Sequence, residues 1–377
     1  MKTYDVVILG GGASGFMAAG YLAQNSSLKV AIIEGNAKTM QKVKVSGGGR
    51  CNFSNVKVDS THYDGDEAYV SKVLDSFCKD DTLEFFRRRN LKSTIRSDKY
   101  YFCKNSADDI MNILKDECSG VTIYLNEKII SVKDGYIVET SKQKLSAKVV
   151  IVASGAESFK TLGATSIGLE IAKSFLLSAT PFSPALVGLT LQPSQFWMKE
   201  LSGISLNAKI SVGSKVLHED LLFAHKGISG LVTLSASLYW KKGDLSIDFL
   251  PNERVNFNSK KHISTGINLS KRFLKSFLKV CELADKPLNK LDKKESEILL
   301  ANLHNYTFAP AGTFGLSKAE VCRGGVKTEE LSESLESKNN KGLYFIGEVV
   351  DVTGELGGYN FQWAFSSAIV CSRNILL

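Results

Sequence analysis

The sequence lacks both a long hydrophobic run and a dense block of one charge. No segment of its 377 residues approaches the roughly 18 consecutive apolar residues that a membrane-spanning helix needs. The apolar run from Val6 to Leu9 is too short for the core of a signal peptide. A net charge of +8 is small for this length, and no five like charges stand together. We therefore expect no membrane span and no secretory leader, with a mild basicity that suits an anionic cofactor or substrate.

Cysteine and histidine occur without a metal-binding or disulfide pattern. The 7 cysteines are odd in number, none forms a CxxC pair, and the 5 histidines are scattered. These spacings favour neither a zinc site nor a disulfide framework. We expect free thiols, no metal centre and a reducing, cytoplasmic location.

The sequence does contain a glycine-rich turn near its start, between a predicted strand and a predicted helix. DVVIL is typical of a buried parallel strand, and Gly10-x-Gly12-x-x-Gly15 follows it directly. FMAAGYLA has the composition of a packed helix, and the next strand, KVAIIE, ends at Glu34. In a dinucleotide-binding unit the glycines allow a tight turn, the helix N-terminus faces a pyrophosphate, and the carboxylate binds ribose hydroxyls. We therefore predict a Rossmann-like site for FAD or NAD, because the charge of Glu34 would repel the 2′-phosphate of NADP.

Three further segments favour FAD over NAD. KVKVSGGGRCNFSN, residues 42–55, combines three glycines with positive charge, and AKVVIVASGAES, residues 147–158, is a strand that ends in small residues. In residues 342–370 a strand, GLYFIGE, precedes a second glycine-rich turn and a helix that starts near Tyr359. The unpaired N–H groups of that helix end would suit a flavin ring, which becomes anionic when it is reduced. NAD has no group that needs this second turn.

Several motifs together resemble the aminoacetone-oxidase-like family of FAD-binding flavoproteins, from Tyr4 to Ile369. They are SGGGRCNFSN, LLFAHKGISG, CRGGV and GEVVDVTGELGGYNFQWAFSS. The resemblance implies an α/β fold: a two-dinucleotide-binding-type, Rossmann-like FAD domain with an inserted β-rich domain and a small helical domain. It also implies that the backbone of Ile129 meets the adenine. Leu231, Cys322 and Cys103 differ from the family's usual Pro, Thr and Pro.

The candidate cofactor-binding residues follow from the motifs and from the resemblance. They are Gly10, Gly12, Ala13, Ser14, Gly15, Glu34, Lys42, Ser46, Gly47, Gly49, Arg50, Cys51, Asn52, Ile129, Ala153, Ser154, Gly155, Gly347, Glu348, Asp351, Gly357, Gly358, Tyr359, Asn360, Phe361 and Gln362.

The middle of the chain changes character. Short alternating strands punctuated by proline begin near Pro181, and residues 269–306 have apolar residues at helical spacing on both sides of Pro287. The expected domains are the two parts of the FAD domain at 1–180 and 323–377, a β-rich domain at 181–255 with a return at 307–322, and a helical domain at 256–306.

One stretch of the predicted β-rich domain, FAHKGISG, is a candidate for chemistry. His225 lies just before a turn, and Ser229 is expected to cap a helix beginning at Gly230. Two interpretations of His225 stay open. It is either a catalytic base or a side chain that orients the turn through a backbone hydrogen bond.

The direction of the redox reaction depends on the electron donor. No second strand–GxGxxG–helix unit follows Gly155. This favours a flavin reduced by a small substrate, an amine or amino-ketone, and reoxidised by oxygen or another acceptor. A reductase of a small unsaturated substrate, with NAD(P)H docking transiently, is the alternative. A flavoprotein that acts on RNA and a non-catalytic FAD-binding partner are further alternatives. The sequence does not favour a nucleic-acid partner, because basic residues are not interleaved with aromatic ones.

Overall fold

The computed structural model describes all residues from 1 to 377 and divides into two compact units. Unit 1 comprises Met1–Ser183 and Val321–Leu377, and unit 2 comprises Pro184–Glu320. Each unit encloses its own hydrophobic core. No helix in the chain is both long enough and apolar enough to cross a membrane.

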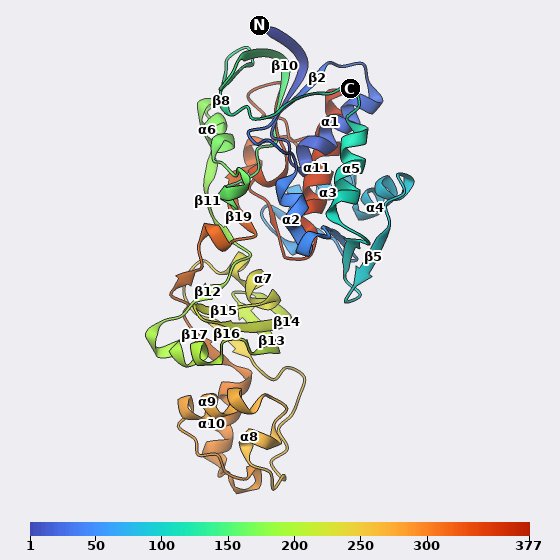
Figure 1. Cartoon of the computed structure of the whole chain (residues 1–377). Helices are drawn as coiled ribbons and strands as arrows, with labels where there is room; N and C mark the ends of the chain where they lie inside the picture. Colours follow the sequence, from blue (N-terminus) through green and yellow to red (C-terminus); the bar gives the residue numbers. More distant parts are fainter. The chain divides into compact units, whose positions relative to one another are not determined.

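Unit 1 is built on a seven-stranded sheet that is parallel in its centre (Figure 1). The strand order is β7-β2-β1-β10-β9-β8, with β20 paired to the C-terminal half of β10. The strands are β1 Lys2–Leu9, β2 Val30–Ile33, β7 Thr122–Tyr124, β8 Ile129–Lys133, β9 Ile137–Thr140, β10 Lys144–Val152 and β20 Leu343–Phe345. The four residues of β2 are all buried, as expected for a parallel strand that is covered on both faces. This confirms the predicted Rossmann-type FAD-domain fold.

The helices of unit 1 are α1 Ala13–Asn25, α2 Gln41–Gly49, α3 Glu67–Ser76, α4 Lys79–Arg88, α5 Ala107–Glu117, α6 Ile167–Ser174 and α11 Tyr359–Ile375. Helices α1 and α6 contact strands of this sheet, and α3 and α4 contact α11. Helix α1 packs against both α5 and α11, and Figure 1 shows these three side by side. Small residues in α1, such as Ala18, Ala19 and Gly20, are buried and allow this close approach. The first and last helices of the chain therefore meet in one core.

Two small sheets and one strand pair complete unit 1 and its boundary. The strand order β3-β6-β5 joins Asn52–Asn55, Tyr100–Cys103 and Ser93–Arg96, and β4 Tyr63–Asp64 pairs with β21 Thr353–Gly354. The chain leaves and re-enters unit 1 along β11 Ala179–Ala185 and β19 Val321–Val326, which form a two-stranded sheet.

Unit 2 contains an antiparallel seven-stranded sheet of order β17-β16-β13-β14-β15-β12-β18. Its strands are β12 Leu189–Thr190, β13 Ser205–Val212, β14 Lys215–Ala224, β15 Gly227–Ser229, β16 Leu245–Asp248, β17 Tyr306–Phe308 and β18 Gly312–Thr313. Its helices are α7 Leu231–Tyr239, α8 Ile263–Gly266, α9 Lys271–Val280 and α10 Lys293–His304. The helical segment shares one hydrophobic core with the sheet, since the rings of Phe249 and Phe273 lie 5.1 Å apart.

Candidate functional site

The first glycine turn joins β1 to α1 and leaves open space beside a helix N-terminus. A Cβ on Gly10 would lie 2.3 Å from the Ala153 carbonyl oxygen, and one on Gly15 would lie 2.1 Å from the Gly10 oxygen. A side chain at either position would collide with the backbone. Gly12 is the N-cap of α1 and makes no side-chain capping bond, and a Cβ there would have nothing within 4 Å. The free N–H groups of Ala13 and its neighbours are thus available to an anion.

Glu34 follows β2 and braces this turn. Its Oε2 accepts a hydrogen bond from Gly11 N at 2.9 Å, and its Oε1 accepts one from Asn36 N at 2.8 Å. A carboxylate oxygen has more than one acceptor position, so the half-buried group could also bind ribose hydroxyls.

The end of β10 lies against the first turn. Gly10 approaches Ala153 and Ser154, and Gly155 has a φ of +68°. The Ser154 hydroxyl oxygen is buried and has no hydrogen-bond partner. The oxygen is covered by protein, since a Cβ on Gly168 would lie 2.5 Å from it.

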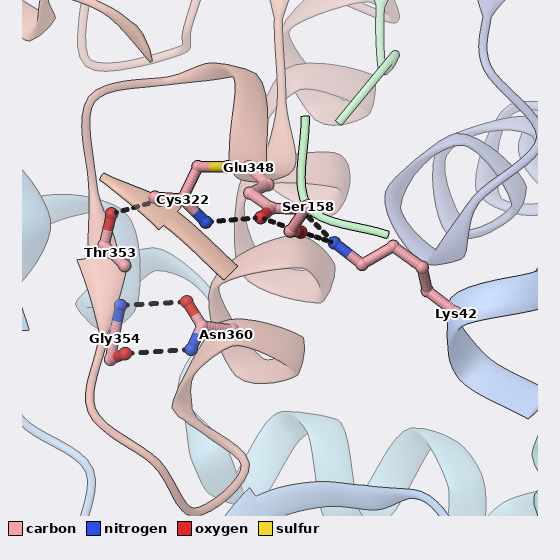
Figure 2. Close-up of polar contacts among 7 residues, drawn as sticks. All are labelled: Lys42, Ser158, Cys322, Glu348, Thr353, Gly354 and Asn360. Carbon is pink, nitrogen blue, oxygen red and sulfur yellow. Dashed lines mark hydrogen bonds and ion pairs between the residues drawn. The ribbon is translucent and has the colours of Figure 1, made fainter. Parts of the chain in front are cut away.

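Lys42, Ser158 and Glu348 bring together the three segments that favour FAD, residues 42–55, 147–158 and 342–370 (Figure 2). The Lys42 Nζ donates to Glu348 Oε2 at 2.7 Å and to Ser158 Oγ at 2.8 Å. The other oxygen, Oε1, accepts from Cys322 N at 3.1 Å. Gly347 approaches α1, because a Cβ on it would lie 2.7 Å from Ser14 Oγ.

In the SGGGRCN segment the regular helical backbone of α2 ends at Ser46. Ser46 leaves helical geometry, and Gly47, Gly48 and Gly49 all have positive φ. Arg50, which follows, is exposed and forms no ion pair, so its guanidinium is available to an anion.

Cys51 and Asn52 face the protein instead of the open side. Cys51 is fully buried beside Cys103, and burial raises the pKa of its thiol well above the usual value. The Asn52 amide nitrogen donates to the carbonyl groups of Tyr101 and Ser54, at 3.1 and 3.0 Å. The Cys51 backbone is also occupied, since its N–H donates to Ser46 O at 3.1 Å and its carbonyl accepts from Cys103 N at 3.3 Å.

The C-terminal glycine turn leads into α11. Gly357 and Gly358 have φ values of +130° and +93°, and Gly358 is the N-cap without a side-chain capping bond. Asn360 holds the turn from within, since its amide pairs with the N–H and carbonyl of Gly354, both at 2.9 Å (Figure 2). The helix end therefore presents unsatisfied N–H groups on a braced turn.

The remaining predicted residues of this region have structural partners. Gln362 is fully buried and bonds Ser54 and Thr82, and Asp351 accepts from Thr180 at 2.6 Å. Tyr359 starts α11 and is buried, and Phe361 stacks on Phe365 at 6.2 Å. Ile129 is the half-buried first residue of β8.

One histidine near this turn was not predicted. The His62 Nδ1 lies 3.0 Å from Asp59 Oδ1, and its ring stacks on Tyr359 with centroids 4.7 Å apart. The pKa of Asp59 is lowered: burial opposes this, but hydrogen bonds from Thr61 and the charge of His62 outweigh it. The stacking could not be read from the sequence, because the two rings come from distant segments.

His225 lies in unit 2, in the exposed turn between β14 and β15. Its ring makes no hydrogen bond to the turn. Gly230, and not Ser229, is the N-cap of α7, because Ser229 is still part of β15.

The geometry of unit 1 fits FAD. Two helices, α1 and α11, begin at glycines without side-chain caps, so each end offers free N–H groups. One suits a pyrophosphate and the other an anionic flavin ring. Glu34, which is half-buried beside the first turn, is placed to receive hydroxyl groups of the same ligand.

Comparisons with known proteins agree with this geometry. The family model described as HI0933-like protein Rossmann domain matches residues 4–374. The chain is 34% identical to the ribosomal RNA dihydrouridine synthase of Escherichia coli K12, over 100% of this chain and 99% of that protein. It is 30% identical to the 3-dehydro-bile acid delta(4,6)-reductase of Clostridium scindens, over 97% of each chain.

One solved structure shows a similar fold. The 3-ketosteroid delta1-dehydrogenase from Sterolibacterium denitrificans has a TM-score of 0.52 and 13% identity, over 100% of this chain and 99% of that chain. At this identity the likeness concerns the fold alone.

The family model and the relatives define an FAD-dependent oxidoreductase. More closely, the chain belongs to the HI0933-like family, whose model covers nearly its whole length. Neither of the two relatives is named for aminoacetone oxidation, so that finer assignment stays a proposal.

Proposed function

We propose that the protein reduces a carbon–carbon double bond conjugated to a carbonyl group, and that its substrate is a uracil base in ribosomal RNA. The observation that carries the proposal is the chemistry shared by the names of two full-length relatives. Dihydrouridine is uridine with two hydrogens added across a double bond conjugated to a ring carbonyl. The bile acid reductase is named for double bonds conjugated to a 3-oxo group. RNA is favoured because the relative named for it is the more similar of the two, at 34% against 30% identity.

FAD would supply a hydride from N5 of its reduced ring to the far carbon of the double bond. In unit 1, the N-terminus of α1 would hold the pyrophosphate, and Glu34 would hold the ribose. The N–H groups that follow Gly358 would stabilise negative charge at the ring, because they are fixed in place before the reaction. The exposed Arg50, which forms no ion pair, would supply a further contact to an anionic group of the cofactor.

The reaction also needs a proton at the carbon next to the carbonyl. His62 is one candidate, because Asp59 fixes its Nδ1 and leaves Nε2 to carry the proton. His225, which the sequence motif indicated, is the other. The variants His62→Gln and His225→Gln test the two candidates. Replacing the true proton donor should remove the basic limb of the pH–rate profile, and replacing the other histidine should leave that limb in place.

The electrons are proposed to come from NAD(P)H that docks transiently against the flavin. Every strand pairing in the sheet of unit 2 is antiparallel, so that unit is not a second parallel dinucleotide fold. The same observation favours a second candidate, oxidation of a small amine or amino-ketone, which needs no nicotinamide.

Anaerobic rapid mixing separates the two directions. The FAD-loaded protein is mixed with NADH, NADPH, or a panel of small amines and amino-ketones, and flavin absorbance is followed. The reductase proposal expects bleaching by NADH or NADPH and none by the amines. Bleaching by an amino-ketone alone would instead support the oxidase.

A further inference from the structure

The positive charge of the chain is concentrated in unit 2. Residues 184–320 contain 18 Lys or Arg against 12 Asp or Glu, which is +6 of the chain's net +8. Within it, residues 256–306 contain 10 basic against 5 acidic residues, or +5. About a seventh of the chain therefore holds more than half of its excess charge.

Helix α9, labelled in Figure 1, carries three lysines at regular spacing. Lys271, Lys275 and Lys279 recur every four residues, so they lie on one face of the helix. All three are exposed, and the structure gives none of them an ion pair. The opposite face is buried in the core of unit 2 through Phe273 and Phe277.

A second basic group lies in the same segment. The chain at 259–263 runs beside 286–289, with Asn289 N donating to Ser259 O and Leu288 N to Lys261 O, both at 3.0 Å. This pairing gathers Lys260, Lys261 and Lys290, all of which are exposed and without an ion pair.

Two charges at the start of α9 are unfavourable for the helix itself, whereas Lys279 lies in its last turn, where a positive charge is favourable. The first turn of α9 has Lys271 and Arg272 and no acidic residue, next to the positive end of the helix dipole. In unit 1, α4 and α5 begin instead with Asp80-Asp81 and Asp108-Asp109, which complement the dipole. Helix stability therefore does not explain Lys271 and Arg272, whereas a polyanionic partner would.

We propose that the three α9 lysines, together with Lys260, Lys261 and Lys290, form an RNA-docking face that binds backbone phosphates. This face rests on the proposed function, since RNA is the polyanion that carries the uracil substrate. Lysine contacts of this kind give affinity without reading sequence, and their strength falls steeply with salt. Recognition of the target base is left to unit 1.

The test compares two triple variants of the full FAD-loaded chain. The first is Lys271→Gln, Lys275→Gln and Lys279→Gln. The control is Lys92→Gln, Lys115→Gln and Lys173→Gln, which removes the same charge from exposed lysines of unit 1 that form no ion pair. Equal flavin content would show that both variants fold. The probe is protein-free bacterial ribosomal RNA, titrated at several salt concentrations.

The docking proposal expects the α9 variant to bind the RNA roughly ten- to a hundredfold more weakly, with a salt slope smaller by about 2 to 3. The control should stay within about threefold of the parent chain. An equal loss of RNA affinity in both variants, or no loss in either, would contradict the proposed docking face. So would lysine-dependent binding to phosphatidylglycerol vesicles without binding to RNA.

Docking and function can fail separately. If the parent chain binds RNA through α9 but forms no dihydrouridine, the proposed substrate is wrong and the face stands. If dihydrouridine forms equally with both variants and their RNA affinities match, the face is wrong and the function stands.

Discussion

The Lys42 ammonium lies 2.7 Å from Glu348 Oε2, although the two residues are 306 positions apart in sequence (Figure 2). The pair ties helix α2 to the turn after β20, and Ser158 and Cys322 hydrogen-bond to the same two groups. Both partners are more shielded than those of Lys44 and Asp108, an ion pair two residues further along α2. Their side chains are 34% and 18% exposed, against 49% and 48%.

Lys42→Met should therefore destabilise the FAD-free protein more than Lys44→Met does. We expect the free energy of unfolding to fall by about 1–2 kcal/mol for Lys42→Met, because Glu348 is left without its partner. For Lys44→Met the change should be below about 0.5 kcal/mol. Urea unfolding followed by circular dichroism measures both, and equal losses would contradict the structural role of the pair.

Glu34→Ala should weaken FAD binding by about 1–3 kcal/mol, since it removes a charged acceptor at the ribose position. The control is Asp5→Asn, which lies within β1 Lys2–Leu9. Asp5 also accepts a backbone hydrogen bond, from Lys29 N at 2.8 Å, but lies away from the glycine turn. Titration of the FAD-free variants with FAD, followed by flavin fluorescence, measures the two dissociation constants. A similar loss in both variants would mean that Glu34 acts only on stability.

Gly358→Ala should be far more destabilising than Gly48→Ala. Both positions have positive φ, which alone costs a side chain about 1–2 kcal/mol. A Cβ on Gly48 would meet open space, whereas one on Gly358 would lie 2.5 Å from the Ser54 carbonyl oxygen. The collision should add about 1–3 kcal/mol. Thermal and urea unfolding of the two variants give the comparison, and matching stabilities would argue against this packing of the turn.

The buried thiols should be unreactive in the folded protein. Burial raises the pKa of Cys322 to about 11, and burial likewise raises that of Cys51. At neutral pH both are protonated and shielded, so iodoacetamide should modify the half-buried Cys78 first. Mass spectrometry after brief labelling determines the order in which the cysteines are modified. We also expect Cys51→Ser with Cys322→Ser to keep turnover, and loss of turnover with FAD still bound would show that a thiol takes part.

Local patterns were enough to predict much of this molecule. The strand, the glycine turn, the helix and Glu34 are neighbours in sequence, and they form β1, α1 and β2 as expected. The helix start near Tyr359 was equally visible, because glycine and a following apolar run mark it locally.

Partnerships across the chain could not be predicted. Lys42 and Glu348 were each expected to face a cofactor, but their mutual contact depends on β20 pairing with β10. The side chains of Asn360 and Gln362 brace the protein, because buried polar groups require partners that only the folded chain supplies. His62 lacked any motif, and its place beside Tyr359 depends on β4 pairing with β21.

The most direct test of the central claim is a single-turnover reaction with RNA. The FAD-loaded protein is reduced in the absence of oxygen and separated from excess reductant. It is then mixed with ribosomal RNA from cells that lack a ribosomal RNA dihydrouridine synthase. Flavin absorbance is followed during the reaction. The RNA is then digested to nucleosides, and their masses are determined by mass spectrometry. We predict that the flavin is reoxidised and that one dihydrouridine appears for each flavin. If the flavin stays reduced and no uridine gains two hydrogens, while an amino-ketone reduces the oxidised protein, the proposed function is contradicted.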